Sequence, residues 1–217
     1  MQSYKTQFIE AAIHADALCF GSFTLKSGRI SPYFFNAGKL CSASSLSVLA
    51  KSYAQAVHAS GIEFDVVFGP AYKGISLAAL TAAAYFDLYG RDVGYTYNRK
   101  EKKDHGEGGT LVGASLVGKK ILVIDDVITA GTAIREVQDI IMHEKGILTG
   151  VVIGLNREER GQGDLSAVQE VERDLSAQVS SIINLADIEG YLRQKDDEAM
   201  LVAIQAYRTQ YGSKLVD

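Results

Sequence analysis

The feature that most constrains the fold is the alternation of strand-like and helix-like segments between residues 64 and 185. FDVVFGP, VGYTYNRK, ILVI, GVVIGL and QVSSIINL have the length and composition of strands, and ILVI and GVVIGL carry no polar side chain. Helical spacing lies between them, as in Ile134, Val137, Ile140 and Ile141 after ILVI. Strands that are apolar on both sides must be covered on both faces. The order therefore predicts an α/β fold whose central, mostly parallel sheet is flanked by helices.

The first 61 residues follow a different pattern. Residues 3–18 and 43–59 are predicted to be amphipathic helices, and Gly61 ends the second. FTLKSGRISPYFFN, between them, predicts two strands around a Ser-Gly-Arg turn, with Pro32 placing the second strand at a sheet edge. The length of 217 residues is that of a single domain, which we expect to span 1–217.

Composition excludes several functional classes. A net charge of −4 and a pI of about 5.6 give no general attraction for nucleic acid. The N-terminus lacks a basic leader followed by an apolar block, and SLAALTAAAYF is too short to span a bilayer. Cys19 and Cys41 have no metal-ligand spacing and are expected to be reduced thiols. We therefore expect a cytoplasmic protein without a nucleic-acid or membrane partner.

Two adjacent acids follow the ILVI strand, in the stretch ILVIDDVITAGTA. Burying Asp125 and Asp126 without partners costs on the order of several kcal/mol. Ligands of parallel sheets bind at the carboxyl ends of the strands, and the small and hydroxylated residues that follow suit a phosphate monoester. Aspartates beside a phosphate site would accept hydrogen bonds from the diol of a phosphorylated sugar. Helix capping is the alternative, but a cap accounts for only one of the two acids.

The segment RKEKKDHGEGGTLVG, Arg99 to Gly113, interrupts the alternation. It mixes charges with glycines and offers no apolar face. We expect a mobile loop or an extended hairpin, with a solvated linker as the simpler alternative.

The stretch ILVIDDVITAGTA resembles the PRPP-binding motif of the type I phosphoribosyltransferases, where PRPP is phosphoribosyl pyrophosphate. That motif consists of hydrophobic residues, two acids, two variable residues, and then Thr, a small residue, Gly and Thr. Ala130 stands where many members carry a hydroxyl, so one phosphate contact would be lost while the backbone cradle remains. FTLKSGRISPYFFN, FGPAYKGI, NRKEKKDHGEGG and LNREERG extend the resemblance to the bacterial orotate phosphoribosyltransferase branch, from about residue 4 to residue 207.

The resemblance implies a type I phosphoribosyltransferase fold in which residues 1–40 form most of a small N-terminal hood. It also implies the site residues. PRPP would be bound by Lys26, Tyr72, Lys73, Arg99, Lys100, Lys103, His105, Asp125, Asp126, Val127, Ile128, Thr129, Ala130, Gly131, Thr132 and Ala133. Orotate would be bound by Phe34, Phe35, Thr129 and Arg157. Catalytic roles would fall to Lys103, His105, Asp125 and Asp126.

The implied reaction is attack of the orotate ring nitrogen on PRPP, which yields orotidine 5'-monophosphate and pyrophosphate in pyrimidine biosynthesis. Mg²⁺ would be held mainly through PRPP and water rather than by protein ligands. The stretch KEKKDHGEGG would exclude water from the site, and Arg99, Lys103 and His105 would reach the neighbouring subunit of a homodimer.

The residues themselves leave some roles open. Arg157 can pair with the orotate carboxylate in a two-point fork, but the glutamates after it make a surface ion pair equally reasonable. Phe34 and Phe35 point to opposite faces of a strand, so only one easily meets a ring, and either can be core. A transferase for another base and a PRPP-sensing regulator without catalysis remain as rival functions.

Overall fold

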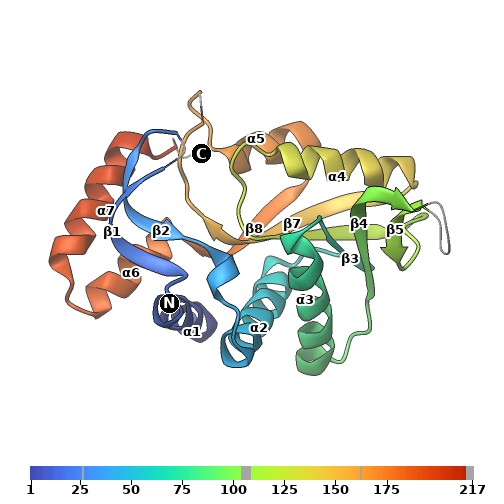
Figure 1. Ribbon diagram of the computed structural model, residues 1–217, viewed down its shortest axis with the longest axis horizontal. Helices are drawn as coiled ribbons and strands as arrows, with labels where there is room; N and C mark the ends of the chain where they lie inside the picture. Colours follow the sequence, from blue (N-terminus) through green and yellow to red (C-terminus); the bar gives the residue numbers. More distant parts are fainter. Residues whose placement is uncertain (26, 104–108, 162, 214–217) are drawn as a thin grey trace.

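The computed structural model contains a six-stranded central sheet in the order β5-β4-β3-β6-β7-β8 (Figure 1). It describes residues 1–25, 27–103, 109–161 and 163–213. The strands are β3 (Val66–Gly69), β4 (Gly94–Lys103), β5 (Gly109–Gly113), β6 (Lys120–Asp125), β7 (Ile147–Asn156) and β8 (Gln178–Asn184). All neighbours pair in parallel except β4 and β5. The predicted mostly parallel sheet is confirmed.

Helices cover both faces of this sheet (Figure 1). One face carries α2 (Ala43–Ser60) and α3 (Lys73–Tyr89), and the other carries α4 (Thr132–His143) and α5 (Ala167–Leu175). Along β6 the side chains alternate between two cores. Leu122 and Ile124 pack on the α2–α3 side, whereas Ile121 and Val123 pack on the α4–α5 side. This burial on both faces explains why the four central residues of the strand, 121–124, are all apolar.

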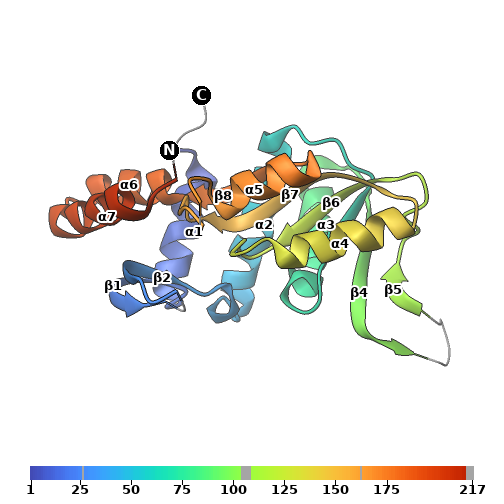
Figure 2. The same cartoon turned by 90° about the horizontal axis from the view of Figure 1, so that it is seen from above.

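Helices from the N-terminal and C-terminal parts of the chain, α1 and α6, contact each other beside β8 (Figure 2). The N-terminal part contains α1 (Ser3–His14), the antiparallel hairpin of β1 (Leu18–Thr24) and β2 (Ile30–Phe35), and the 3-10 turn η1 (Ala37–Lys39). The C-terminal part contains α6 (Leu185–Gln194) and α7 (Glu198–Tyr211). Helix α7 contacts β2, and the rings of Tyr207 and Tyr33 meet edge to face at 6.2 Å.

The prediction of a helix over residues 3–18 was wrong at its C-terminal end. Helix α1 ends at His14, and Asp16 has a left-handed backbone with φ of 53°. Leu18 already pairs with Phe35 in the hairpin. Pairing within the β1–β2 hairpin therefore overrides the local helical spacing.

The charged segment forms an extended hairpin, one of the two predicted forms. Strand β4 continues through Arg99 to Lys103 and pairs with β5, with Asn98 opposite Leu111. Residues 104–108 lie outside the described residues. The expectation that this segment has no apolar face was wrong, because Leu111 packs against the core on the α4–α5 side. Within the described residues, no helix is both long and apolar enough to cross a bilayer.

Candidate active site

The paired aspartates lie at the carboxyl end of β6. One carboxylate oxygen of Asp125 accepts a hydrogen bond from the Asp126 amide at 2.9 Å. Asp126 accepts from the Val127 amide at 3.0 Å and from Lys73 Nζ at 2.8 Å. The N-cap of α4 is Gly131 rather than either aspartate. Capping therefore does not explain the pair, and the acids remain available as acceptors for a ligand.

Burial controls the ionisation of Asp125. Loss of solvent contact raises the pKa of Asp125 to about 6, an effect that the amide of Asp126 and the charge of Lys73 oppose. The Tyr53 hydroxyl donates a hydrogen bond to the main-chain oxygen of Asp125 at 2.8 Å. The amide of Gly154 in β7 donates to the Asp126 oxygen at 2.9 Å. The backbone beneath the two acids is thus fixed from both α2 and β7.

Residues 127–131 form an open loop that leads into the first residues of α4, Thr132 and Ala133. Gly131 has φ of +70°, and a Cβ there would lie 2.7 Å from Val171 Cγ2, so the position requires glycine. Arg135 Nη1 donates to the Ala130 oxygen at 2.8 Å and holds the loop. Among the described residues, the amides of residues 129–131 have no acceptor. The exposed residues between positions 127 and 133 are Thr129, Ala130, Thr132 and Ala133. This arrangement is suited to an anion at a helix N-terminus.

A second loop, after β3, lies beside the aspartates. Gly69 ends the strand, and a Cβ on it would approach the Gly74 oxygen to 2.3 Å, so the tight turn requires glycine. Tyr72 and Lys73 follow and are both exposed, and Lys73 reaches Asp126. From β4, Lys100 Nζ lies 5.2 Å from the centre of the Tyr72 ring. The structure thus brings together four of the predicted PRPP-binding residues.

Of the remaining predicted PRPP-binding residues, the structure describes only some. Arg99 lies on β4 next to Lys100 and is half-buried. Lys26, His105 and the side chain of Lys103 lie outside the described residues.

The two phenylalanines of β2 point to opposite faces, as predicted for an extended strand. Phe34 is 40% exposed, and its ring lies 5.7 Å from that of Phe23. Phe35 is buried and packs against Phe8 at 6.2 Å. Only the Phe34 side chain is therefore placed to meet a ligand ring, and Phe35 can contribute its backbone.

Arg157 follows the end of β7, on the same sheet edge as the aspartates. Its side chain is only 17% exposed, and its guanidinium lies 4.5 Å from the centre of the Tyr33 ring. Nε and Nη2 contact one oxygen of Glu159 at 2.8 and 2.6 Å. The ion pair considered from the sequence exists, but it is buried at the candidate site rather than solvated.

Carboxylates are the available protein ligands for Mg²⁺ at this site. Among the described residues, no group of three or more His, Cys, Asp or Glu side chains could hold a metal ion. Asp125 and Asp126 supply hard oxygen donors, and one oxygen of Asp126 is already engaged by Lys73. This donor set fits Mg²⁺ that takes most of its ligands from water and a bound phosphate compound.

Comparison with known proteins agrees with this geometry. Residues 43–162 match the model of the phosphoribosyl transferase domain. The chain is 58% identical, over 99% of its length and all of the relative, to orotate phosphoribosyltransferase of Cellvibrio japonicus (strain Ueda107). The chain belongs to the orotate phosphoribosyltransferase family. The Pseudomonas aeruginosa PAO1 enzyme of this name is 57% identical over 98% of this chain and all of the relative.

Solved structures show the same relationship. The crystal structure of orotate phosphoribosyltransferase from Francisella tularensis matches with a TM-score of 0.88 at 41% identity, covering 95% of this chain and all of the other. The type I phosphoribosyltransferase fold, an α/β domain with a mostly parallel six-stranded sheet, is therefore established.

Sequence reasoning considered Glu159 only as a surface partner of Arg157, and it missed Tyr53. The backbone between Arg157 and Glu159 is not extended, because Glu158 has φ of 53°, so strand alternation does not place the two side chains together. Tyr53 lies on α2, 72 positions before Asp125. The contact between the Tyr53 hydroxyl and the Asp125 main chain depends on helix packing, and no local sequence motif predicts it.

Proposed function

We propose that this orotate phosphoribosyltransferase family member transfers the ribose 5-phosphate group of PRPP to orotate, giving orotidine 5'-monophosphate and pyrophosphate. This is the penultimate step to UMP in pyrimidine biosynthesis. The observation that carries the proposal is the pair Asp125–Asp126 beside an open anion cradle, residues 129–133, on one strand end. Acceptors for a diol and donors for a phosphate then fit one phosphorylated sugar. The two curated relatives support the choice of orotate.

Each part of the site has a role in this reaction. The amides of residues 129–133 bind the 5'-phosphate, and Asp125 and Asp126 accept hydrogen bonds from the ribose hydroxyls. Arg157 binds the orotate carboxylate. The ring nitrogen gives up its proton to solvent and forms a bond to the anomeric carbon, while the bond to pyrophosphate breaks and pyrophosphate leaves with the electron pair. Lys73 and Lys100 supply fixed positive charge near that leaving group.

We include Mg²⁺ in the proposal because PRPP carries a pyrophosphate group, which binds this ion. When bound, it supplies positive charge that stabilises the developing negative charge on pyrophosphate. Asp125 and Asp126 would orient its water ligands.

A homodimer with shared sites is also proposed. On α3, Phe86 is 53% exposed, and Tyr72, just before the helix, is 66% exposed; the helical repeat places these two side chains on one face. Such a face suits a second copy of the chain. The segment Lys100–Gly109 would complete the site of the partner subunit, a role that rests on the resemblance.

A cytoplasmic location follows from the soluble, charged substrates.

The decisive experiment follows orotate absorbance in the presence of PRPP and Mg²⁺. We expect absorbance to fall only when all three components and the protein are present. A transferase for another base would leave orotate unchanged and consume adenine, guanine or uracil in parallel reactions. A PRPP-binding regulator would consume none of these bases. Either result would reject orotate transfer.

A further inference from the structure

Arg157 does not offer its whole guanidinium to a substrate. Its Nε and Nη2 both contact Oε1 of Glu159, and Nη2 also lies 3.4 Å from Ser31 Oγ. Among the described residues, Nη1 makes no hydrogen bond. The edge formed by Nε and Nη2 is thus occupied within the protein, and Nη1 remains for a ligand.

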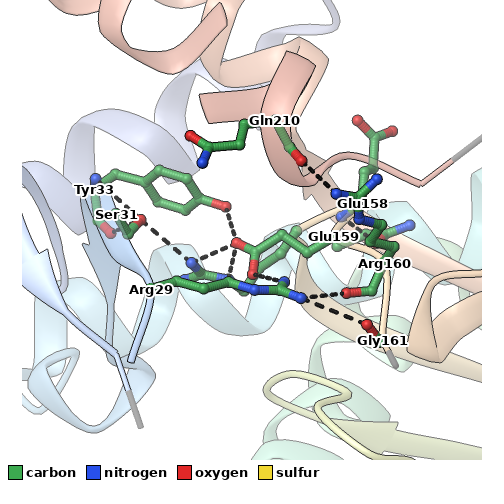
Figure 3. Close-up of polar contacts among 10 residues, drawn as sticks. Arg29, Ser31, Tyr33, Glu158, Glu159, Arg160, Gly161 and Gln210 are labelled. Atoms are coloured by element: carbon green, nitrogen blue, oxygen red, sulfur yellow. Dashed lines mark hydrogen bonds and ion pairs between the residues drawn. The ribbon is translucent and has the colours of Figure 1, made fainter. Parts of the chain in front are cut away.

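Glu159 is itself held firmly. Its side chain is 14% exposed and lies between Tyr33 and Arg29, as Figure 3 shows. The Tyr33 hydroxyl donates to Oε1 at 3.3 Å, and Arg29 Nη1 lies 3.6 Å from Oε2. Because three side chains share this carboxylate, moving it away would leave Arg29 and Tyr33 without their acidic partner.

The residues around Glu159 are anchored by the C-terminal helix. Arg29 Nη2 donates to the Arg160 oxygen at 3.1 Å, and the guanidinium lies 4.9 Å from the centre of the Tyr211 ring. The side chain of Arg160 donates to the Gln210 oxygen at 2.8 Å (Figure 3). The cluster is therefore connected to β2, the end of β7 and α7, and it forms a rigid support.

We propose that Glu159 is a positioning residue for the orotate carboxylate, acting by fixing the guanidinium of Arg157. This inference deepens the proposed function and rests on it. The charges agree with the role, since Arg29 and Arg157 together exceed Glu159 by one positive charge. That excess suits a ligand with a single carboxylate, and a neutral base would leave it uncompensated.

A competing role makes the opposite prediction. If Glu159 merely blocked Arg157 until orotate displaced it, removing its charge would improve orotate binding. If Glu159 positions Arg157, the same change weakens orotate binding and leaves PRPP binding intact. The direction of the change in orotate KM therefore separates the two roles.

The test is Glu159→Gln, which keeps the size of the side chain but removes its charge. We expect the orotate KM at saturating PRPP to rise about tenfold, equivalent to about 1.4 kcal/mol, while the KM for PRPP changes less than about twofold. The matched control is Glu158→Gln. Glu158 pairs with Arg208 at 3.2 Å rather than with Arg157, and its substitution should leave the orotate KM unchanged.

A double-mutant cycle tests whether the effect passes through Arg157. In an Arg157→Ala background, Glu159→Gln should raise the orotate KM no further. The same tenfold rise in that background, a fall in KM in the single variant, or an unchanged KM would each overturn the proposal. Should Glu159→Gln fail to fold, Glu159→Asp keeps the charge but shortens the side chain, and it must also raise the orotate KM. Wild-type protein that consumes no orotate would instead reject the proposed function.

Discussion

The carboxyl group of Asp125 lies where burial opposes its ionisation. Its pKa of about 6 exceeds the ordinary value of 3.8, so the folded protein binds this proton more tightly than the unfolded chain does. The contribution of Asp125 to stability is therefore most favourable below about pH 4, and it is lost as the pH rises through 6. At neutral pH the ionised group costs on the order of 3 kcal/mol. We infer that the ionised carboxylate of Asp125 lowers the stability of the fold but is retained because the ligand needs a hydrogen-bond acceptor there.

Asp125→Asn should accordingly separate stability from activity. We expect turnover to fall more than tenfold, while the free energy of unfolding at pH 7.5 rises by roughly 1–3 kcal/mol. Thermal unfolding at pH 7.5 and pH 4.5 measures the second effect, and the gain should shrink at the lower pH. Asp126→Asn is the comparison, because it breaks the pair with Lys73 and should lower turnover without raising stability. Wild-type turnover in both variants would contradict the diol assignment.

The decrease of kcat/KM at acid pH also reports the ionisation of Asp125. With wild-type protein, kcat/KM for PRPP should decrease below about pH 6 as Asp125 becomes protonated and loses an acceptor site. In Asp125→Asn this limb should be absent from the residual activity. A limb that persists in the variant belongs to the phosphates of PRPP rather than to Asp125.

Arg157 supports a second prediction at this scale. Arg157→Ala should weaken orotate binding by roughly 2–5 kcal/mol, because a buried charge-assisted contact is lost and Glu159 loses one of its partners. Arg157→Lys should restore little, since an ammonium cannot contact Glu159 and a substrate with a planar group. Titration calorimetry with orotate and with PRPP makes the comparison. Equal losses for the two ligands would exclude a specific contact with the orotate carboxylate.

At the scale of elements, the loop before α4 depends on one glycine. Gly131 and Gly118 have nearly the same backbone, with φ of +70° and +67°, but only Gly131 has neighbouring atoms within 4 Å of a built Cβ. Alanine at either position should cost about 1–2 kcal/mol through its backbone conformation. Gly131→Ala must also displace Val171 or the loop itself, so the KM for PRPP should rise more than tenfold.

Gly118→Ala is the matched control for this prediction. It should lower the thermal midpoint by a similar amount while the KM for PRPP stays within about twofold of wild type. If the two variants raise this KM equally, the close contact of Gly131 with Val171 does not position the phosphate loop.

Sequence reasoning predicted best the elements in which burial determines the polarity of successive residues. ILVI is apolar throughout because β6 is covered on both faces, and this alone placed Asp125 at a strand end. Strand β5 was harder, because GTLVG gains its conformation from pairing with β4 rather than from its own composition. The extra residues assigned to α1 failed for the same reason, since Leu18 pairs with Phe35 in the first hairpin. Local spacing does not report the partner strand, even when that strand is the next one along the chain.

At the scale of the molecule, the candidate orotate site depends on contacts between the two ends of the chain. Ser31 contacts Arg157, 126 positions later, and Tyr33 packs on Tyr207. The motifs predicted which residues gather at the site, but the support given by α7 follows only from the path of the whole chain. The family resemblance supplied the roles of Lys26, Lys103 and His105, which stay predictions.

The last prediction concerns sites shared between two subunits. In the proposed dimer, the intact segment Lys100–Gly109 of one chain completes a site whose aspartates come from the other. Lys103→Ala and Asp125→Asn should each have little activity alone but complement each other when mixed. In a mixed dimer, one site combines the intact Asp125 of the first chain with the intact Lys103 of the second, and the other site carries both changes.

Random exchange makes half of the dimers mixed, and each mixed dimer has one complete site of two. Activity should therefore recover to roughly a quarter of wild type under closed two-fold symmetry. Subunit exchange is verified with two differently tagged chains, and each variant mixed with itself is the control. If Lys103 served only its own subunit, every site in a mixed dimer would carry one change. Verified exchange without recovery would then place the charged segment over its own site, and the exposed face of α3 would require a different role.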